Sequence, residues 1–180
     1  MQRRALRGTM MGVTVAALAL AACSSDGGAD VEISMAMAPP PGTFTASGDA
    51  VDDGMLCATG QWDDGGTFDE DGDPISGEEW AQAFDSAMAD ETVVSGISVR
   101  TFTCTDEGAV GSIEVADTVS IDFAQIDPQE WSEGDIASAE AGTWSVDGAT
   151  GDMSGMTGGG DLTWNLDGQQ IVYSGQVSES

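Results

Sequence analysis

Apolar and polar side chains alternate along most of the chain after residue 42, a pattern typical of half-buried β-strands. The clearest run is residues 95–104, where Ile97, Val99, Phe102 and Cys104 stand among serines and threonines. Residues 111–123 also alternate and are long enough for one bent strand or two. Further runs bounded by Gly or Asp lie at residues 42–47, 55–62, 143–147, 161–166 and 170–177. Many short strands with glycine-rich turns predict a sandwich or a barrel.

One segment departs from this alternation. In residues 77–89, Trp80, Phe84 and Met88 recur every fourth position, which predicts one apolar stripe on a helix. Ser76 is a good N-cap, and acidic residues in the first turn favour the helix dipole. We expect a short helix whose stripe packs on the β-structure; a partner-binding stripe is the alternative.

The first 22 residues have the features of a signal peptide. Three arginines precede an apolar run over residues 10–20, which is shorter than the roughly 20 residues of a membrane-spanning helix. The run ends in Leu-Ala-Ala-Cys, which resembles the lipobox of bacterial lipoproteins, whose cysteine is acylated and becomes the first mature residue. This pattern predicts a lipid on Cys23 and anchoring to the outer face of the cell membrane. An ordinary signal peptide and an uncleaved anchor are the alternatives.

The composition excludes several classes of function. The chain has 180 residues, 32 of them acidic, with four arginines and neither lysine nor histidine, so histidine bases and lysine Schiff bases are excluded. Removal of residues 1–22 leaves Arg100 alone against all 32 acidic residues, a net charge of −31. Such a surface repels phosphate backbones and excludes nucleic acid, whereas cations or a cationic partner are compatible. Solubility or adaptation to salt explains the same charge.

Two cysteines remain after Cys23 is assigned to the lipid. An even pair in an extracytoplasmic protein predicts a disulfide between Cys57 and Cys104. Free thiols that bind a metal or act in catalysis are the alternative.

Three stretches, residues 42–60, 99–108 and 143–158, together resemble a group of uncharacterised secreted actinobacterial proteins. Their pattern pairs a cysteine after an A-V-D-x-G stretch with one in F-T-C, and it ends in a T-W-x-V-x-G-T-G-x-Y-x-G-L-x-G hairpin. The hairpin is similar to that of allene oxide cyclase and dirigent barrels, which implies an antiparallel barrel of about eight strands. Here Ala149 is an extra residue, and Met153 and Met156 replace the aromatic residue and the leucine. The resemblance implies a fold and no chemistry.

The sharpest candidate for a metal site is a set of acidic side chains ahead of the predicted helix: Asp69, Asp71, Asp73 and Glu79, with Glu78 as the alternate. Residues 69–80 resemble an EF-hand-type calcium loop, whose alternating carboxylates and later glutamate converge on one cation. The loop lacks the glycine expected after its third acid, because Pro74 follows directly. Ca²⁺ binding through these carboxylates is one interpretation of the segment, and a solvated acidic turn ahead of the helix is the other.

Together these patterns predict three segments: a signal peptide (1–22), a lipidated flexible tether (23–42) and an acidic β-barrel domain (43–180) with one inserted helix. No residue is identified as catalytic, and we expect a binding or interaction module at the cell surface rather than an enzyme. The alternatives are a small-molecule-converting enzyme of the cyclase-like barrel type and a structural envelope lipoprotein.

Overall fold

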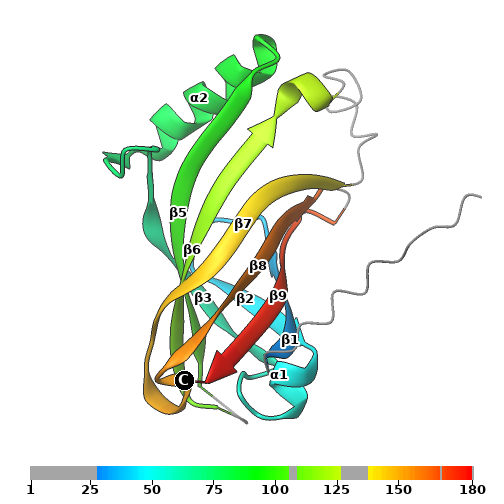
Figure 1. Ribbon diagram of the computed structural model, residues 1–180. Coiled ribbons are helices and arrows are strands. Elements are labelled where there is room, and N and C mark those ends of the chain that lie inside the picture. Colours follow the sequence, from blue (N-terminus) through cyan, green and yellow to red (C-terminus); the bar gives the residue numbers. More distant parts are fainter. Residues whose placement is uncertain (1–27, 106–108, 127–137, 167, 180) are drawn as a thin grey trace, which may run out of the picture.

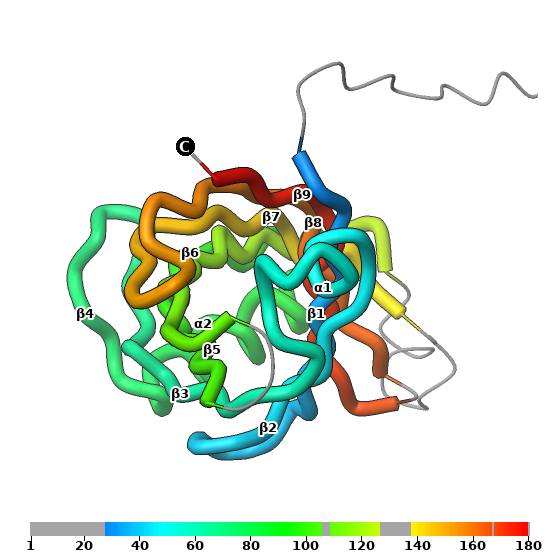
Figure 2. Tube along the Cα trace, turned by 90° about the horizontal axis from the view of Figure 1, so that it is seen from below, coloured from blue at the N-terminus to red at the C-terminus, as the bar shows by residue number. Residues whose placement is uncertain are grey.

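A computed structural model describes residues 28–105, 109–126, 138–166 and 168–179. Eight antiparallel strands form a closed barrel, and a short ninth strand, β4 (Pro74–Ile75), pairs with the end of β3 (Figure 1). The barrel strands are β1 (Ala29–Ala36), β2 (Gly42–Ser47), β3 (Thr59–Phe68), β5 (Val93–Cys104), β6 (Gly111–Asp122), β7 (Ser138–Ala149), β8 (Met156–Asn165) and β9 (Gln170–Glu179). The ring closes because β2 pairs with both β1 and β3 (Figure 2). The predicted all-β barrel with an inserted helix is confirmed.

The alternation in the sequence places every second side chain inside the barrel. In β6, the inward residues Ile113, Val115, Asp117, Val119 and Ile121 are buried, and the residues that alternate with them are more exposed. The strand is continuous from Gly111 to Asp122, so residues 111–122 form one strand rather than two.

Helix α2 (Gly77–Ala89) lies across the upper end of the barrel in Figure 1. It begins with a capping box, in which the Ser76 side chain accepts from the Glu79 backbone N–H and the Glu79 carboxylate accepts from the Ser76 backbone N–H. Its Phe84 ring lies 5.0 Å from the ring of Phe123 and 5.9 Å from that of Trp164. The predicted stripe therefore packs on the barrel.

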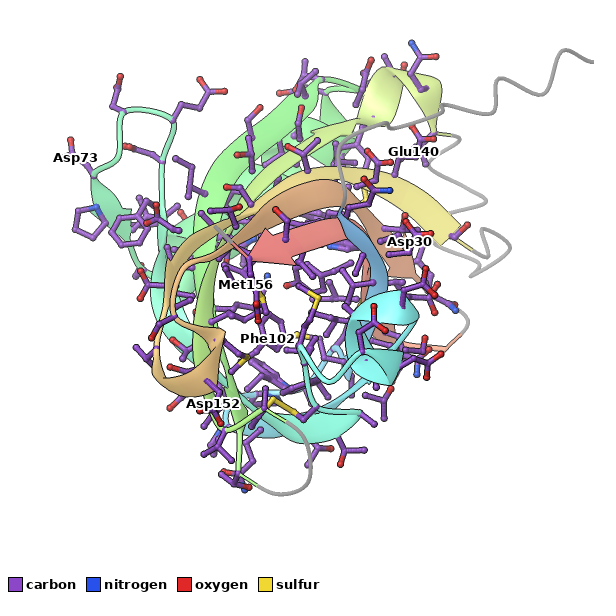
Figure 3. The ribbon with its side chains drawn as sticks, turned by 60° about the horizontal axis from the view of Figure 1, so that its bottom comes forward. Asp30, Asp73, Phe102, Glu140, Asp152 and Met156 are labelled. Atoms are coloured by element: carbon purple, nitrogen blue, oxygen red, sulfur yellow. A yellow bond between two sulfur atoms is a disulfide. The ribbon has the colours of Figure 1, made fainter. Side chains whose placement is uncertain are left out.

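The lower end of the barrel is filled by side chains. Helix α1 (Asp49–Asp52) lies there in Figure 1, and a disulfide joins Cys57, which follows it in the chain, to Cys104 at the end of β5. Two 3₁₀ turns, η1 (Phe123–Gln125) and η2 (Gly151–Met153), follow β6 and β7. Figure 3 shows Met156 and Phe102 inside the ring of strands, and both are buried. The two ends of the barrel therefore differ: one is packed, and the other lies under α2.

The expected tether through residue 42 is wrong for the residues that the structure describes. Ala29–Ala36 form β1, which pairs with β2 on one side and with β9 on the other, so the barrel begins well before residue 43. Val31, Ile33 and Met35 point inward and are buried. This short alternation was hidden between a Gly/Ser stretch and a proline run, which made the whole segment resemble a linker.

Other elements begin and end closer to the residues predicted from the sequence. The strand expected at residues 55–62 begins only at Thr59 and continues to Phe68, because residues 49–56 turn beneath the barrel through α1. The helix matches its predicted range of residues 77–89.

Within the described ranges, no helix has the length and apolar character needed to cross a membrane.

Candidate functional site

Three polar side chains meet inside the barrel, one each from β5, β6 and β9. Arg100 forms an ion pair with Asp117, whose side chain has no exposed surface. The Arg100 guanidinium also donates to the Tyr173 hydroxyl at 2.7 Å, and that hydroxyl donates to Asp117 Oδ2 at 2.9 Å. The Arg100 side chain is 15 % exposed, so its guanidinium is the part of the network that reaches solvent.

Aromatic packing holds the network in place. The Tyr173 ring meets Phe102 edge to face at 5.4 Å and Trp144 at 6.1 Å. Trp144 is itself fixed by a hydrogen bond from Nε1 to the backbone oxygen of Ser174, at 3.3 Å. These ring contacts help to hold the Tyr173 hydroxyl toward Asp117 and Arg100.

Burial raises the pKa of Tyr173 to about 12, against an opposing effect of the Arg100 guanidinium. Desolvation dominates because a phenolate is costly to hold away from water. The phenol therefore remains protonated at neutral pH and serves as a hydrogen-bond donor.

Within the described ranges, two buried side-chain atoms have no hydrogen-bond partner: Asp117 Oδ1 and Trp62 Nε1. Unpartnered buried polar atoms are rare in folded proteins, because each forfeits its hydration. Asp117 Oδ1 is an acceptor within the polar network. Trp62 Nε1 is a donor, and Trp62 lines one of the two cavities described next.

Two cavities flank Arg100 toward the end of the barrel that α2 covers, which we call the mouth. A cavity of about 150 Å³ lies beneath α2 and is lined by Trp80, Trp164, Gly96, Ser98 and Thr67, among others. A second, of about 320 Å³, is lined by Trp62, Ile171 and the end of β1 with the residues that follow it. Asp64 and Arg100 line both cavities, so the two adjoin across this pair of side chains.

The strand register explains why Asp64 and Arg100 meet. They are cross-strand partners on β3 and β5, and a β-bulge follows Asp64. Trp80 reaches the same place because Gly96 has no side chain: a Cβ there would lie 2.6 Å from the Trp80 ring. The mouth thus combines indole walls, two hydroxyl groups and one carboxylate around a paired guanidinium.

A wider depression of about 680 Å³ lies on the outer surface of the barrel. It is lined by the acidic side chains Asp122, Glu140 and Asp161 from β6, β7 and β8. Exposed carboxylates of this kind are solvated, and the depression has none of the buried polar groups found at the mouth. We therefore place the candidate site at the mouth.

The predicted metal ligands lie outside the barrel, around the turn between β3 and β4, and Asp73 points outward in Figure 3. Asp69 Oδ1 accepts from the backbone N–H groups of Asp71 and Asp73, at 3.0 and 2.9 Å. The Glu79 carboxylate is held in the capping box, which lowers its pKa through hydrogen bonds from Ser76. The described residues contain no group of three or more ligands placed for a metal ion. Calcium binding by the loop therefore stays a prediction.

Of the cysteines, Cys57 and Cys104 form the predicted disulfide, with a Cα–Cα distance of 5.7 Å. Cys23 lies outside the described residues, and so does its predicted lipid. The network of Arg100, Asp117 and Tyr173 was not predicted from the sequence. A signal for it exists, since Arg100 and Asp117 occupy inward positions of strands whose other inward residues are mostly apolar.

Comparisons with protein-family models, with curated proteins and with solved structures find no match for this chain. The barrel and the geometry of its mouth are therefore the basis for any functional conclusion.

Proposed function

We propose that this protein is an extracytoplasmic binding module that takes a small molecule in the mouth of its barrel. The observation that carries the proposal is the pair of cavities around Arg100, with Trp62, Trp80 and Trp164 in their walls. Ligand sites are concave and mostly apolar, with a few polar groups held in fixed directions. The network of Arg100, Asp117 and Tyr173 supplies such fixed groups.

The buried ion pair of Arg100 and Asp117 supports a binding function, because stability alone does not explain it. Apolar residues of similar volume stabilise a core about as well as a buried ion pair does, or better. An arginine and an aspartate in this position are therefore better explained by the need for oriented polar groups beside the cavities. The unpartnered oxygen of Asp117 adds to this argument.

The proposal includes a lipid on Cys23, which would hold the barrel on the outer face of the cell membrane. β1 begins at Ala29, so the chain from Cys23 to the barrel spans at most about 20 Å. β1 starts at the packed lower end, and its last residues line a mouth cavity at the other end (Figure 1). A barrel anchored in this way would hold its packed end near the membrane and its mouth away from it.

The anchor is tested by feeding cells an alkyne-tagged fatty acid and detecting label on the protein. We expect labelled protein in the membrane fraction, and unlabelled protein with Cys23→Ser. Equal labelling of the variant would refute lipidation at this cysteine.

The binding site is tested with the full chain in a maltoside detergent, by ligand-observed NMR with compact neutral, anionic and cationic compounds. We expect at least one compound to bind, and binding to weaken in Trp80→Leu but not in Val93→Leu, a change at an exposed position. The proposal would be overturned if no class of compound bound, or if Trp80→Leu left binding unchanged. Either result would favour a structural envelope lipoprotein.

An enzyme is the second candidate. The unpartnered Asp117 oxygen and the adjacent Tyr173 hydroxyl support it. Mass spectrometry of a bound compound after long incubation separates the two functions. An unchanged compound favours binding, whereas conversion that is lost in Asp117→Asn favours catalysis.

A further inference from the structure

We propose that the ligand of the mouth is a compact organic cation with an alkylammonium group, held between Trp80 and Trp164 beside Asp64. This inference rests on the proposed binding function and specifies the chemistry of its ligand. Three features of the mouth support it: its charge balance, its aromatic walls and its size.

The charge balance favours a cation even though Arg100 lines the cavity. The guanidinium is already in an ion pair with the fully buried carboxylate of Asp117, so these two groups contribute no net charge. Asp64 lines both cavities and adds one negative charge at the mouth. Arg100 is the one cationic side chain in the part of the chain that the structure describes. The field around the barrel is therefore negative, and it concentrates cations and repels anions.

The aromatic walls suit an alkylammonium ion better than a metal ion. Trp80 comes from α2 and Trp164 from β8, and both line the smaller cavity. Phe84 stacks on Trp164 at 5.9 Å and holds it against the helix. Indole is the side chain that attracts organic cations most strongly through its ring quadrupole. Within the described residues no three potential metal ligands converge, so these walls lack the oxygen set that hard metal ions require.

The size of the cavity limits the ligand. Its volume is about 150 Å³, similar to an engineered protein cavity of that volume that binds benzene. A trimethylammonium group is of comparable size, and the attached chain of a longer ligand would lead out past Asp64 and Arg100 toward the second cavity. The side chains of Thr67 and Ser98 supply hydroxyl groups at the wall.

The test uses three probes of nearly the same shape: choline, neutral 3,3-dimethylbutanol and anionic 3,3-dimethylbutyrate. Binding to the full chain in maltoside detergent is measured by NMR titration, with NaCl added to hold ionic strength constant. We expect choline to bind with a dissociation constant in the millimolar range, as befits so few atoms, and more tightly than either analogue.

Asp64→Asn removes the charge and keeps the side-chain oxygen that accepts from the Gly66 N–H. A charge a few ångströms away in water contributes about 1 kcal/mol, so choline binding should weaken about fivefold, with the neutral alcohol unaffected. Asp63→Asn is the matched control: it is the next residue on β3, is exposed, and lines neither cavity. It makes the same charge change on the opposite face of the strand and should leave choline binding within about twofold of wild type.

The outcomes separate this inference from the function on which it rests. If the alcohol or the anion binds at the Trp80 site as tightly as choline, the ligand class is wrong and the binding site stands. Equal effects of Asp64→Asn and Asp63→Asn would also overturn the inference, since choline would then respond only to the overall charge. If none of the probes and none of the compounds of the wider screen binds there, both proposals fail.

Discussion

Tyr173 is the single tyrosine of the chain, so its ionisation is directly measurable. Its hydroxyl lies inside the barrel, donates to Asp117 and accepts from Arg100. Burial raises the pKa of this phenol from 10.0 to about 12. Raising the pH from neutral to 12 is therefore a perturbation that reports on this one group. No lysine is present and Cys57 and Cys104 are oxidised, so no other side chain of the barrel changes charge between pH 10 and 12.

The expected loss of stability follows from the two pKa values. Below pH 10 the phenol is protonated in both the folded and the unfolded protein, and its contribution is fully present. Between pH 10 and 12 the unfolded chain releases the proton and the folded protein keeps it, so the free energy of unfolding falls as the pH rises. A difference of two pKa units corresponds to a loss of about 3 kcal/mol across this range.

Two measurements test this reasoning: the near-ultraviolet absorbance of tyrosinate, and urea unfolding at several pH values. We expect the folded protein to show no tyrosinate at pH 10 and the free energy of unfolding to fall above it. Tyr173→Phe should remove this fall, at a cost of about 1–3 kcal/mol for the lost hydrogen bonds at all pH values. Half-titration near pH 10 in a protein that is still folded would refute the buried position of the hydroxyl.

Three further predictions concern the network, the disulfide and the acidic loop. Asp117→Asn leaves the largely buried Arg100 guanidinium unpaired and should lower the free energy of unfolding by about 3–5 kcal/mol. The double variant Arg100→Met with Asp117→Leu should lose less, because neither charge remains buried without its partner. A double variant that loses as much as the two single changes added together, measured by urea unfolding, would contradict this. Replacing Cys57 and Cys104 by Ala opens a link across 47 positions and should cost about 4 kcal/mol; an unchanged denaturation midpoint would show the bond to be dispensable. If the acidic loop binds Ca²⁺ as predicted, Ca²⁺ should raise the melting temperature more than Mg²⁺ does, and neutralising Asp69 should remove the difference; equal rises would show charge screening alone and refute the site.

Local patterns in the sequence were sufficient to predict most, but not all, elements of this fold. The period-two alternation in residues 111–123 follows the buried face of β6. Residues 95–104 lie in β5 as expected, but Ile97 and Val99 take its more exposed face, and Phe102 and Cys104 its buried face. The helix over residues 77–89 was equally clear, since its cap and apolar stripe lie within a few turns of each other. β1 was missed because three alternating apolar residues between a glycine-serine stretch and a proline run make a weak local signal. Its place is decided by the open sheet edges of β2 and β9, which are distant in sequence.

The candidate site was decided by tertiary structure. Arg100, Asp117 and Tyr173 are separated by 17 and 56 positions in the chain and meet only because the barrel closes with a particular register. The same holds for Trp80 and Trp164, which share a cavity because α2 crosses the mouth. The acidic loop is contiguous in sequence, and its composition predicted a metal site that stays untested. The structure adds that Asp69 accepts hydrogen bonds within the loop and Glu79 in the helix cap. Sequence alone determined most of the strands, the helix α2 and the overall charge, because these depend on neighbouring residues. Which side chains face each other across the barrel depends on strand register and closure, and only the folded chain sets these.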